Sequence, residues 1–246
     1  DGLYQVSDFD YDAATKTYTL KDGVPYAGEK GNVKPGMWKF KNIDGSKDNK
    51  ITEADKTVIG NAYPKIYGGI NNTFTYKDFD LSIFLTYSIG NDVFNATKLT
   101  NTKTALQNKN VLAVADSKHR WVLVNKAGDL ITDPQEMADI NKGKTVAAIY
   151  DNEAGDTYIH SWAVEDGSFL KLSNITLGYT FPKKMIRKVG LSKLRLYATG
   201  SNLLTWTKYS GFDPEVSTMG NGLTPGVDFG AYPRSRAFVF GINLAF

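Results

Sequence analysis

Residues 235–246 read S-R-A-F-V-F-G-I-N-L-A-F, and the fold prediction starts from the pattern of this stretch. From Phe238 onward a large apolar residue occupies every second position, and the residues between are smaller or polar. A period of two predicts a β-strand, because successive side chains of a strand point to opposite faces. One apolar face, one polar face and an aromatic end are typical of a transmembrane β-barrel strand. An edge strand of a soluble sandwich has the same pattern, so this stretch alone leaves both interpretations open.

The same alternation recurs upstream, in residues 66–76, 81–89, 169–181 and 194–206. The first two runs are joined by Lys77 and Asp78, which predicts a β-hairpin. The third run changes phase near Ser173 and Asn174, which predicts a β-bulge. In the barrel interpretation one strand face meets lipid, and seven residues are predicted to lie on it: Leu81, Ile83, Leu85, Leu196, Phe238, Phe240 and Ile242.

The connections between these runs alternate in length. They are short at Lys77, long over 97–165, short at Lys183 and medium over 207–233. Strands of about ten residues with short turns at one end and long loops at the other are the organisation of a membrane barrel. We therefore predict an all-β fold, a transmembrane antiparallel β-barrel of which this chain supplies about five strands.

This organisation predicts four parts. Residues 1–62 form an outer loop region and 63–96 a barrel hairpin, whereas 97–165 form a long outer loop and 166–246 the remaining strands. Residues 1–36 are polar and rich in turn residues, so we expect an exposed loop with little core, apart from part of a short hairpin at 18–20. A short helix is predicted over 134–142, with Asp133 as its N-cap and Pro134 at its first position.

The composition narrows the class of protein. No apolar run approaches the ~18 residues that a membrane helix requires. Cysteine is absent, which excludes disulfides and thiolate metal sites. The net charge of +3 is small and dispersed, so nucleic-acid binding is not expected. The chain opens without a signal-peptide pattern and starts in mid-pattern, so we expect it to be a C-terminal piece of a longer protein.

One segment has the spacing of a calcium-binding loop: D-G-S-K-D-N-K-I-T-E-A-D, residues 44–55. Such a loop takes oxygen ligands from fixed positions and a tight turn at the sixth, here Asn49. The candidate calcium ligands are Asp44, Ser46, Asp48, the Lys50 carbonyl, Thr52 and Asp55. Two features depart from the pattern, because Asp55 replaces the longer Glu and Lys47 adds a positive charge. The alternative is a solvated polar turn that holds no ion.

No catalytic site is predicted, and we do not expect an enzyme. The two histidines, His119 and His160, lie in the long segment 97–165 among acidic residues. No motif places a nucleophile or a metal-binding trio beside either of them. We interpret both as surface histidines.

Longer blocks of sequence resemble the SusC-like (RagA-like) branch of the TonB-dependent outer-membrane transporters. The resemblance is carried, in the family's order, by residues 42–65, 71–95, 166–182, 194–215 and the closing strand. Members of that family usually have Asn and Gly where this chain has Ser46 and Asn49, which weakens the calcium prediction. Nothing in the chain matches the family's N-terminal plug or its TonB-contacting segment. The resemblance therefore implies the final part of a plugged barrel of about 22 strands.

The resemblance also implies the function and the partners. Relatives lie in the outer membrane and import glycan or peptide fragments, driven by TonB through the plug. A SusD-like surface lipoprotein would close over the outer loops as a lid, and the strands would contact outer-membrane lipid. From a different class, the alternative is a soluble calcium-binding β-sandwich that binds surface glycans. That alternative requires the apolar strand faces to be buried against a second sheet.

Overall fold

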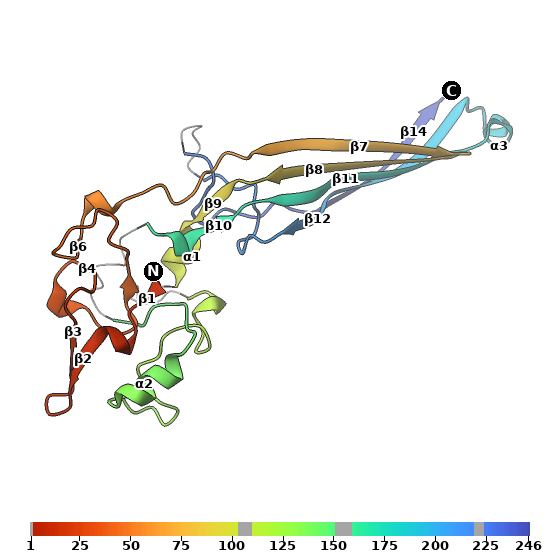
Figure 1. Cartoon of the computed structure of the whole chain (residues 1–246). Helices are drawn as coiled ribbons and strands as arrows, with labels where there is room; N and C mark the ends of the chain where they lie inside the picture. The colour runs from red at the N-terminus through yellow and green to blue at the C-terminus, as the bar shows by residue number, and fades with distance from the viewer. Residues whose placement is uncertain (1, 103–109, 151–158, 219–223) are drawn as a thin grey trace. The chain divides into compact units, whose positions relative to one another are not determined.

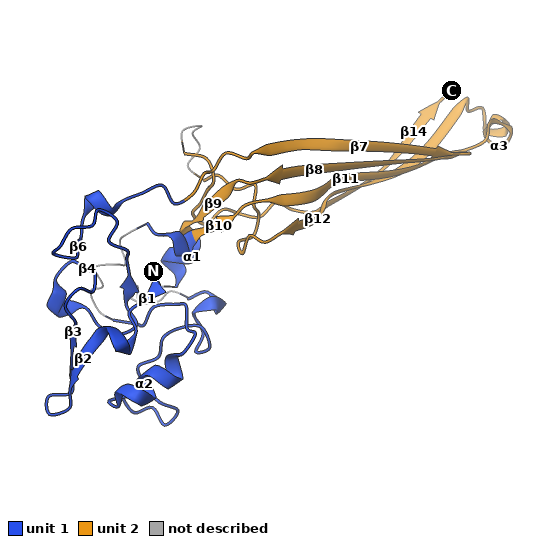
Figure 2. Cartoon of the chain, viewed as in Figure 1, with its two compact units in different colours: residues 1–59, 97–163 blue, residues 60–96, 164–246 orange. Residues whose placement is uncertain are grey.

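The structure of the chain is a computed structural model that describes residues 2–102, 110–150, 159–218 and 224–246. Parts of the predicted loops 97–165 and 207–233 therefore lie outside the described residues. The chain divides into two compact units, coloured separately in Figure 2. Unit 1 comprises residues 1–59 and 97–163, and unit 2 comprises residues 60–96 and 164–246.

Unit 2 contains a sheet of five long strands that lie side by side in Figure 1. The strands are β7 (Ile66–Tyr76), β8 (Phe79–Ile89), β11 (Phe169–Thr180), β12 (Lys193–Thr207) and β14 (Ala237–Ala245). Each pairs antiparallel with the next along the chain. The predicted strands, their number and the hairpin at Lys77 are confirmed. The register of β11 shifts between Leu172 and Asn174, which confirms the predicted bulge.

The register assigns most large apolar side chains of the five strands to one face, whereas Phe84, Phe169 and Val239 lie on the other. Leu81 pairs with Phe74 and Leu177, and the same parity continues through Leu196 to Ile242. Directly opposed residues of antiparallel strands share a face, so the seven residues predicted to face lipid do lie on one side of the sheet. This apolar face is open in β14, where Phe238 is 67% exposed and Phe240 is 80% exposed. The other face is polar and is formed mainly by Thr, Ser, Asn, Asp, Lys and Arg side chains.

The sheet has two open edges. Among the described residues, β7 pairs only with β8, and β14 pairs only with β12. A strand edge leaves backbone N–H and C=O groups without partners, so it is a site for pairing with further strands. No helix in the described ranges is long and apolar enough to cross a membrane.

Short elements occupy the two ends of the sheet. At the end of the long connections, β9 (Asp92–Asn95) pairs antiparallel with β10 (Val164–Asp166) and parallel with β13 (Val227–Asp228). At the end of the short turns, α3 (Lys183–Ile186) lies in the connection between β11 and β12 (Figure 1).

Unit 1 is built from short elements. They are β1 (Gly2–Leu3), β2 (Phe9–Asp12), β3 (Thr17–Leu20), β4 (Tyr26–Ala27), β5 (Trp38–Lys39), β6 (Lys50–Ile51) and α2 (Pro134–Asn141), and α1 (Ala96–Asn101) begins at the boundary between the units. The pairing of β2 with β3 confirms the predicted hairpin. The Asp133 side chain accepts a hydrogen bond from the Glu136 N–H at 2.7 Å, which confirms the predicted N-cap of α2.

The expectation that residues 1–36 have little core was wrong. Tyr4, Phe9, Leu20 and Val33 are buried together. A second core contains Leu3 and Trp38 beside Trp121 and Met137, so it joins the first segment of unit 1 to the second. Strands of two to four residues are too short to produce a readable alternation, and the partners are distant in sequence. The sequence pattern therefore did not reveal these cores.

Candidate functional site at the rim of the sheet

The polar face of unit 2 carries a buried ion cluster at the end of the long connections. The Lys171 side chain on β11 is 3% exposed. Its Nζ lies 2.6 Å from an oxygen of Glu215 and 3.8 Å from one of Asp213. Arg234 lies 3.3 Å from the same Glu215 carboxylate and 3.9 Å from Asp213. Two acidic residues of the connection 208–236 are thus held between Lys171 on the sheet and Arg234.

Further hydrogen bonds fix this connection to the rim. The Ser210 hydroxyl and N–H each donate to Glu165 on β10 at 2.8 Å. The Tyr209 hydroxyl donates to Asp228 at 2.6 Å. Burial, together with the Asp228 carboxylate, raises the pKa of Tyr209, so this phenol stays protonated. Residues 208–218 and 224–228 therefore form an ordered cover for the polar face.

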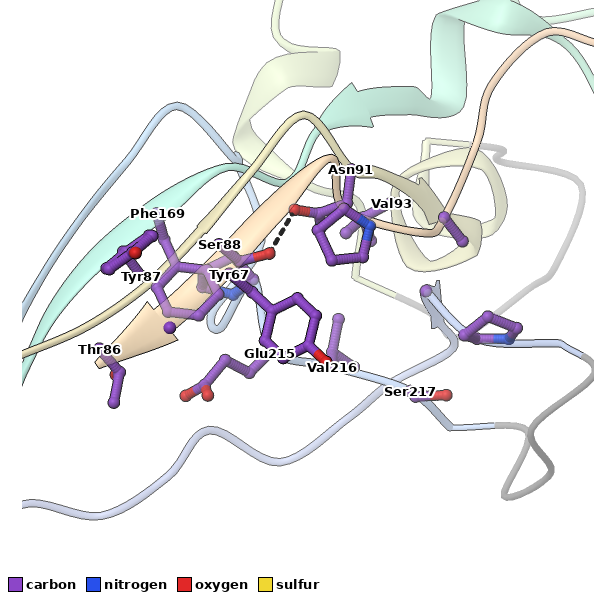
Figure 3. A pocket seen from close by; sticks show the side chains of 16 residues that line it. Tyr67, Thr86, Tyr87, Ser88, Asn91, Val93, Phe169, Glu215, Val216 and Ser217 are labelled. Atoms are coloured by element: carbon purple, nitrogen blue, oxygen red, sulfur yellow. Dashed lines mark hydrogen bonds between the residues drawn. The ribbon is translucent and has the colours of Figure 1, made fainter.

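A pocket of about 460 Å³ lies between this cover and the sheet (Figure 3). The wall combines aromatic rings, hydroxyls and one carboxylate. It includes Tyr67 of β7, Thr86 and Ser88 of β8, Phe169 of β11 and Glu215 of the cover. Ser88 is held in place because its hydroxyl donates to Asn91 at 2.8 Å, drawn as a dashed line in Figure 3. Rings that stack, beside hydroxyls and a carboxylate, suit a polar organic ligand.

A second ion pair crosses the polar face near the short turns. The Arg195 guanidinium on β12 donates to both oxygens of Asp80 on β8, at 2.9 and 2.5 Å. The pair passes directly over Gly178 on β11, where a Cβ atom would lie 2.4 Å from the guanidinium and 2.5 Å from the carboxylate. A Cβ atom at this position would therefore displace the ion pair.

In the predicted calcium loop, the carboxylates accept hydrogen bonds from backbone N–H groups in and next to the loop. The Asp55 carboxylate accepts hydrogen bonds from the N–H groups of Ile43 at 2.7 Å and Thr52 at 2.8 Å. These backbone donors hold the pKa of Asp55 below its usual range. Asp44 accepts from the Ser46 N–H and Asp48 from the Lys50 N–H.

Within the described part of the chain, no three carboxylate or histidine side chains are grouped as a metal site would require. The other predicted oxygen donors of the loop are neutral, and the Thr52 hydroxyl accepts from the Ala54 N–H as the cap of a short 3-10 turn. Calcium binding by Asp44, Ser46, Asp48, Lys50, Thr52 and Asp55 stays a prediction.

The two histidines have different surroundings. His119 is exposed, and its Nδ1 lies 2.7 Å from Asp116. His160 is not a surface residue of the expected kind, because its ring packs against Trp38 at 4.6 Å and Phe40 at 5.7 Å between ring centroids. It is part of an aromatic cluster whose other rings are distant in sequence, so no local pattern predicted these contacts.

Sequence reasoning missed the rim site. The only indication in the sequence was the position of Lys171, because its place in the alternation of β11 predicts that it lies on the polar face. Its acidic partners, Asp213 and Glu215, are distant in sequence and lie in an irregular segment. Only the folded connection brings these charges together.

Known proteins with similar sequences or structures are TonB-dependent receptors and a transporter of the same fold. No protein-family model matches the chain. TonB-dependent receptor P3 of Formosa agariphila is 30% identical over 250 residues, which cover 100% of this chain and 21% of that protein. TonB-dependent receptor SusC of Bacteroides thetaiotaomicron is 28% identical over 206 residues, which cover 83% of this chain and 17% of SusC.

A solved structure, that of the RagAB peptide transporter, superimposes with a TM-score of 0.62 at 24% identity, over 80% of this chain and 19% of that one. The likeness supports the barrel-strand fold. The chain spans about a fifth of the length of the curated relatives named above.

Proposed function

We propose, since this chain belongs to the SusC-like branch of the TonB-dependent receptors, that it forms part of the wall of an outer-membrane nutrient importer. The observation that carries the proposal is the sheet of unit 2. Most of its large apolar side chains share one face across five strands, and its polar face bears the ion cluster and the pocket. An apolar outer face and a polar interior are what a barrel wall requires.

The cargo in this proposal is a glycan or peptide fragment. The pocket at the rim supports that class, because Tyr67 and Phe169 offer rings for stacking, and Ser88 and Glu215 are polar. We place the pocket on the path of the cargo into the barrel. A SusD-like lipoprotein would cover the outer connections, and TonB would drive import through parts of the receptor that this chain does not contain.

Among the described residues, no second sheet covers the apolar face as the sandwich alternative requires. It requires the apolar face to be covered, yet Phe238, Phe240 and Ile242 are all more than half exposed among the described residues. The family assignment also favours the barrel. A calcium ion in the 44–55 loop would accompany either function and does not discriminate between them.

The experiment measures uptake of labelled oligosaccharides and oligopeptides by cells that produce the intact receptor. Wild-type cells should accumulate one of these classes, and dissipating the energy supply should abolish uptake. Glu215→Gln should lower uptake, because it removes a carboxylate of the pocket and leaves buried Lys171 without its closest partner.

Glu136→Gln is the matched control, because it makes the same change at an exposed residue of α2. Normal uptake by the Glu215→Gln receptor would remove the pocket from the cargo path. Absence of energy-dependent uptake of both classes by wild-type cells would contradict the importer itself.

A further inference from the structure

The connection between β11 and β12, residues 181–192, carries a group of exposed cations; we call it the basic turn. Lys183, Lys184, Arg187 and Lys188 follow one another over α3 and the next 3-10 turn, and all four are exposed. None of the four forms a salt bridge within the described ranges. The turn contains no Asp or Glu. Its positive charge is therefore uncompensated locally.

Two large apolar side chains stand among these cations. Met185 is 61% exposed and Val189 is 70% exposed. Ile186, by contrast, is 3% exposed, so it anchors the turn against the protein. The turn is closed by hydrogen bonds from the Leu191 N–H to the Ile186 carbonyl and from the Phe181 N–H to the Leu194 carbonyl. The exposed apolar groups are thus presented by an ordered segment.

Aromatic rings lie beside the basic turn on the apolar face. Tyr179 packs against Phe79 at 4.7 Å and against Phe181 at 4.9 Å between ring centroids. Tyr76 of the neighbouring hairpin is 71% exposed, and Lys77 lies over its ring. In a barrel, a band of aromatic rings marks the level of the lipid headgroups. The basic turn follows directly after that band in the chain.

We propose that the basic turn binds the anionic headgroups of phospholipids in the inner leaflet of the outer membrane. The inference rests on the proposed function, which puts the short turns on the inner side. Cations attract the headgroup phosphates, and Met185 and Val189 enter the boundary of the acyl chains. Basic residues beside exposed apolar ones are the pattern of segments that lie in a membrane interface.

Charge complementarity favours an anionic phospholipid as the ligand of the basic turn. A zwitterionic lipid offers no net charge to four neighbouring cations, whereas phosphatidylglycerol offers one negative charge per molecule. A soluble protein partner would explain the cations but not the band of aromatic rings on the same end of the sheet.

The test uses the intact receptor, purified in detergent and titrated with phosphatidylglycerol or phosphatidylcholine, with bound lipid counted by native mass spectrometry. Wild-type receptor should bind phosphatidylglycerol more tightly than phosphatidylcholine. The triple variant Lys184→Gln, Arg187→Gln and Lys188→Gln should weaken phosphatidylglycerol binding by roughly fivefold per cation removed and leave phosphatidylcholine binding unchanged.

The matched control neutralises three exposed lysines of unit 1: Lys16→Gln, Lys118→Gln and Lys126→Gln. It should bind phosphatidylglycerol as wild type does. A second variant, Met185→Gln with Val189→Gln, should weaken the binding of both lipids, because it removes the apolar contact and keeps the charge.

Equal binding of both lipids by wild type, or an equal loss in the triple variant and its control, would overturn the inference. So would a periplasmic protein whose capture depends on the four cations while the lipid preference does not. Electrophoresis with and without heating identifies a folded barrel independently. A receptor without a heat-sensitive barrel contradicts the proposed function, whereas a folded barrel without lipid preference contradicts only the lipid site.

Discussion

The two units of this chain differ in the exposure of their large apolar side chains, which are buried in unit 1 and exposed on the sheet of unit 2. In unit 1, Trp121 is 2% exposed and Met137 is 5% exposed, at the centre of a packed core. In the sheet of unit 2, Phe240 is 80% exposed and Trp206 is 53% exposed, on a face that nothing in the described chain covers. Water favours the first arrangement and opposes the second. This contrast is what the proposed function requires, since it gives unit 1 a core that forms in water and the sheet a face that meets lipid.

The largest expected effect is on solubility. Residues 1–246 produced alone, without detergent, should aggregate, because the sheet exposes a broad apolar face and two unpaired edges. Size-exclusion chromatography with and without detergent measures this. A soluble monomer that unfolds cooperatively in water would contradict the assignment of the sheet to lipid and would favour the soluble sandwich.

Truncating a buried ring should be costly in unit 1. Trp121→Ala should destabilise this unit by about 3–5 kcal/mol, because it leaves a cavity in the core. Trp206→Ala on the apolar face of the sheet should cost far less. Hydrogen exchange of the intact receptor compares the two: protection should fall through unit 1 in the first variant and stay at wild-type levels in the second.

An arginine introduced on the apolar face tests whether that face contacts lipid or water. Phe240→Arg should destabilise the barrel by about 2–4 kcal/mol if the residue lies near the midplane, because the guanidinium enters hydrocarbon. Val239→Arg, one residue away on the polar face, should be tolerated. Folding titrations into lipid vesicles give both values. Equal tolerance of the two arginines would refute the facing assignment.

A smaller effect is expected on the polar face. Gly178→Ala should displace the Asp80–Arg195 ion pair, because the new methyl group takes its place. Loss of hydrogen bonds between charged groups should cost about 1–3 kcal/mol. Gly190→Ala is unsuited as a control because Gly190 has φ = 77°. Gly31→Ala is suited, since no atom lies within 4 Å of its Cβ position and its φ is not positive.

The smallest effect is expected from the 44–55 loop. The pKa of Asp55 is lower in the folded state, so its contribution to stability is present at neutral pH and is lost as the pH falls through that lowered value. Hydrogen exchange near Ile43 and Thr52 should therefore rise in acid for wild type. In Asp55→Asn it should already be faster at neutral pH and depend less on pH.

Calorimetric titration of wild type and Asp48→Asn with calcium tests the metal prediction. If the loop holds calcium, wild type should bind the ion and Asp48→Asn should bind it more weakly. No heat of binding at millimolar calcium would leave the loop as a polar turn held by Asp55.

Strand prediction succeeded where the face on which a side chain lies depends only on its odd or even position in the strand. The alternation in residues 66–76 and 194–206 is visible because one face is mainly apolar, and the bulge at Ser173 appears as a change of phase. The helix over Pro134–Asn141 was also readable, because Asp133 and Pro134 are local signals. In each case the evidence lies within a few residues of the element itself.

Local period and blocks of matching residues were sufficient to predict the five strands, the common apolar face and the resemblance to SusC-like receptors. The cores of unit 1, the aromatic surroundings of His160 and the cluster of Lys171 with Glu215 and Arg234 became apparent only in the folded structure. The physical reason is distance along the chain. A contact between Lys171 and Glu215, or between Trp38 and Trp121, leaves no period in the sequence, since it forms only when irregular connections fold back on segments far away.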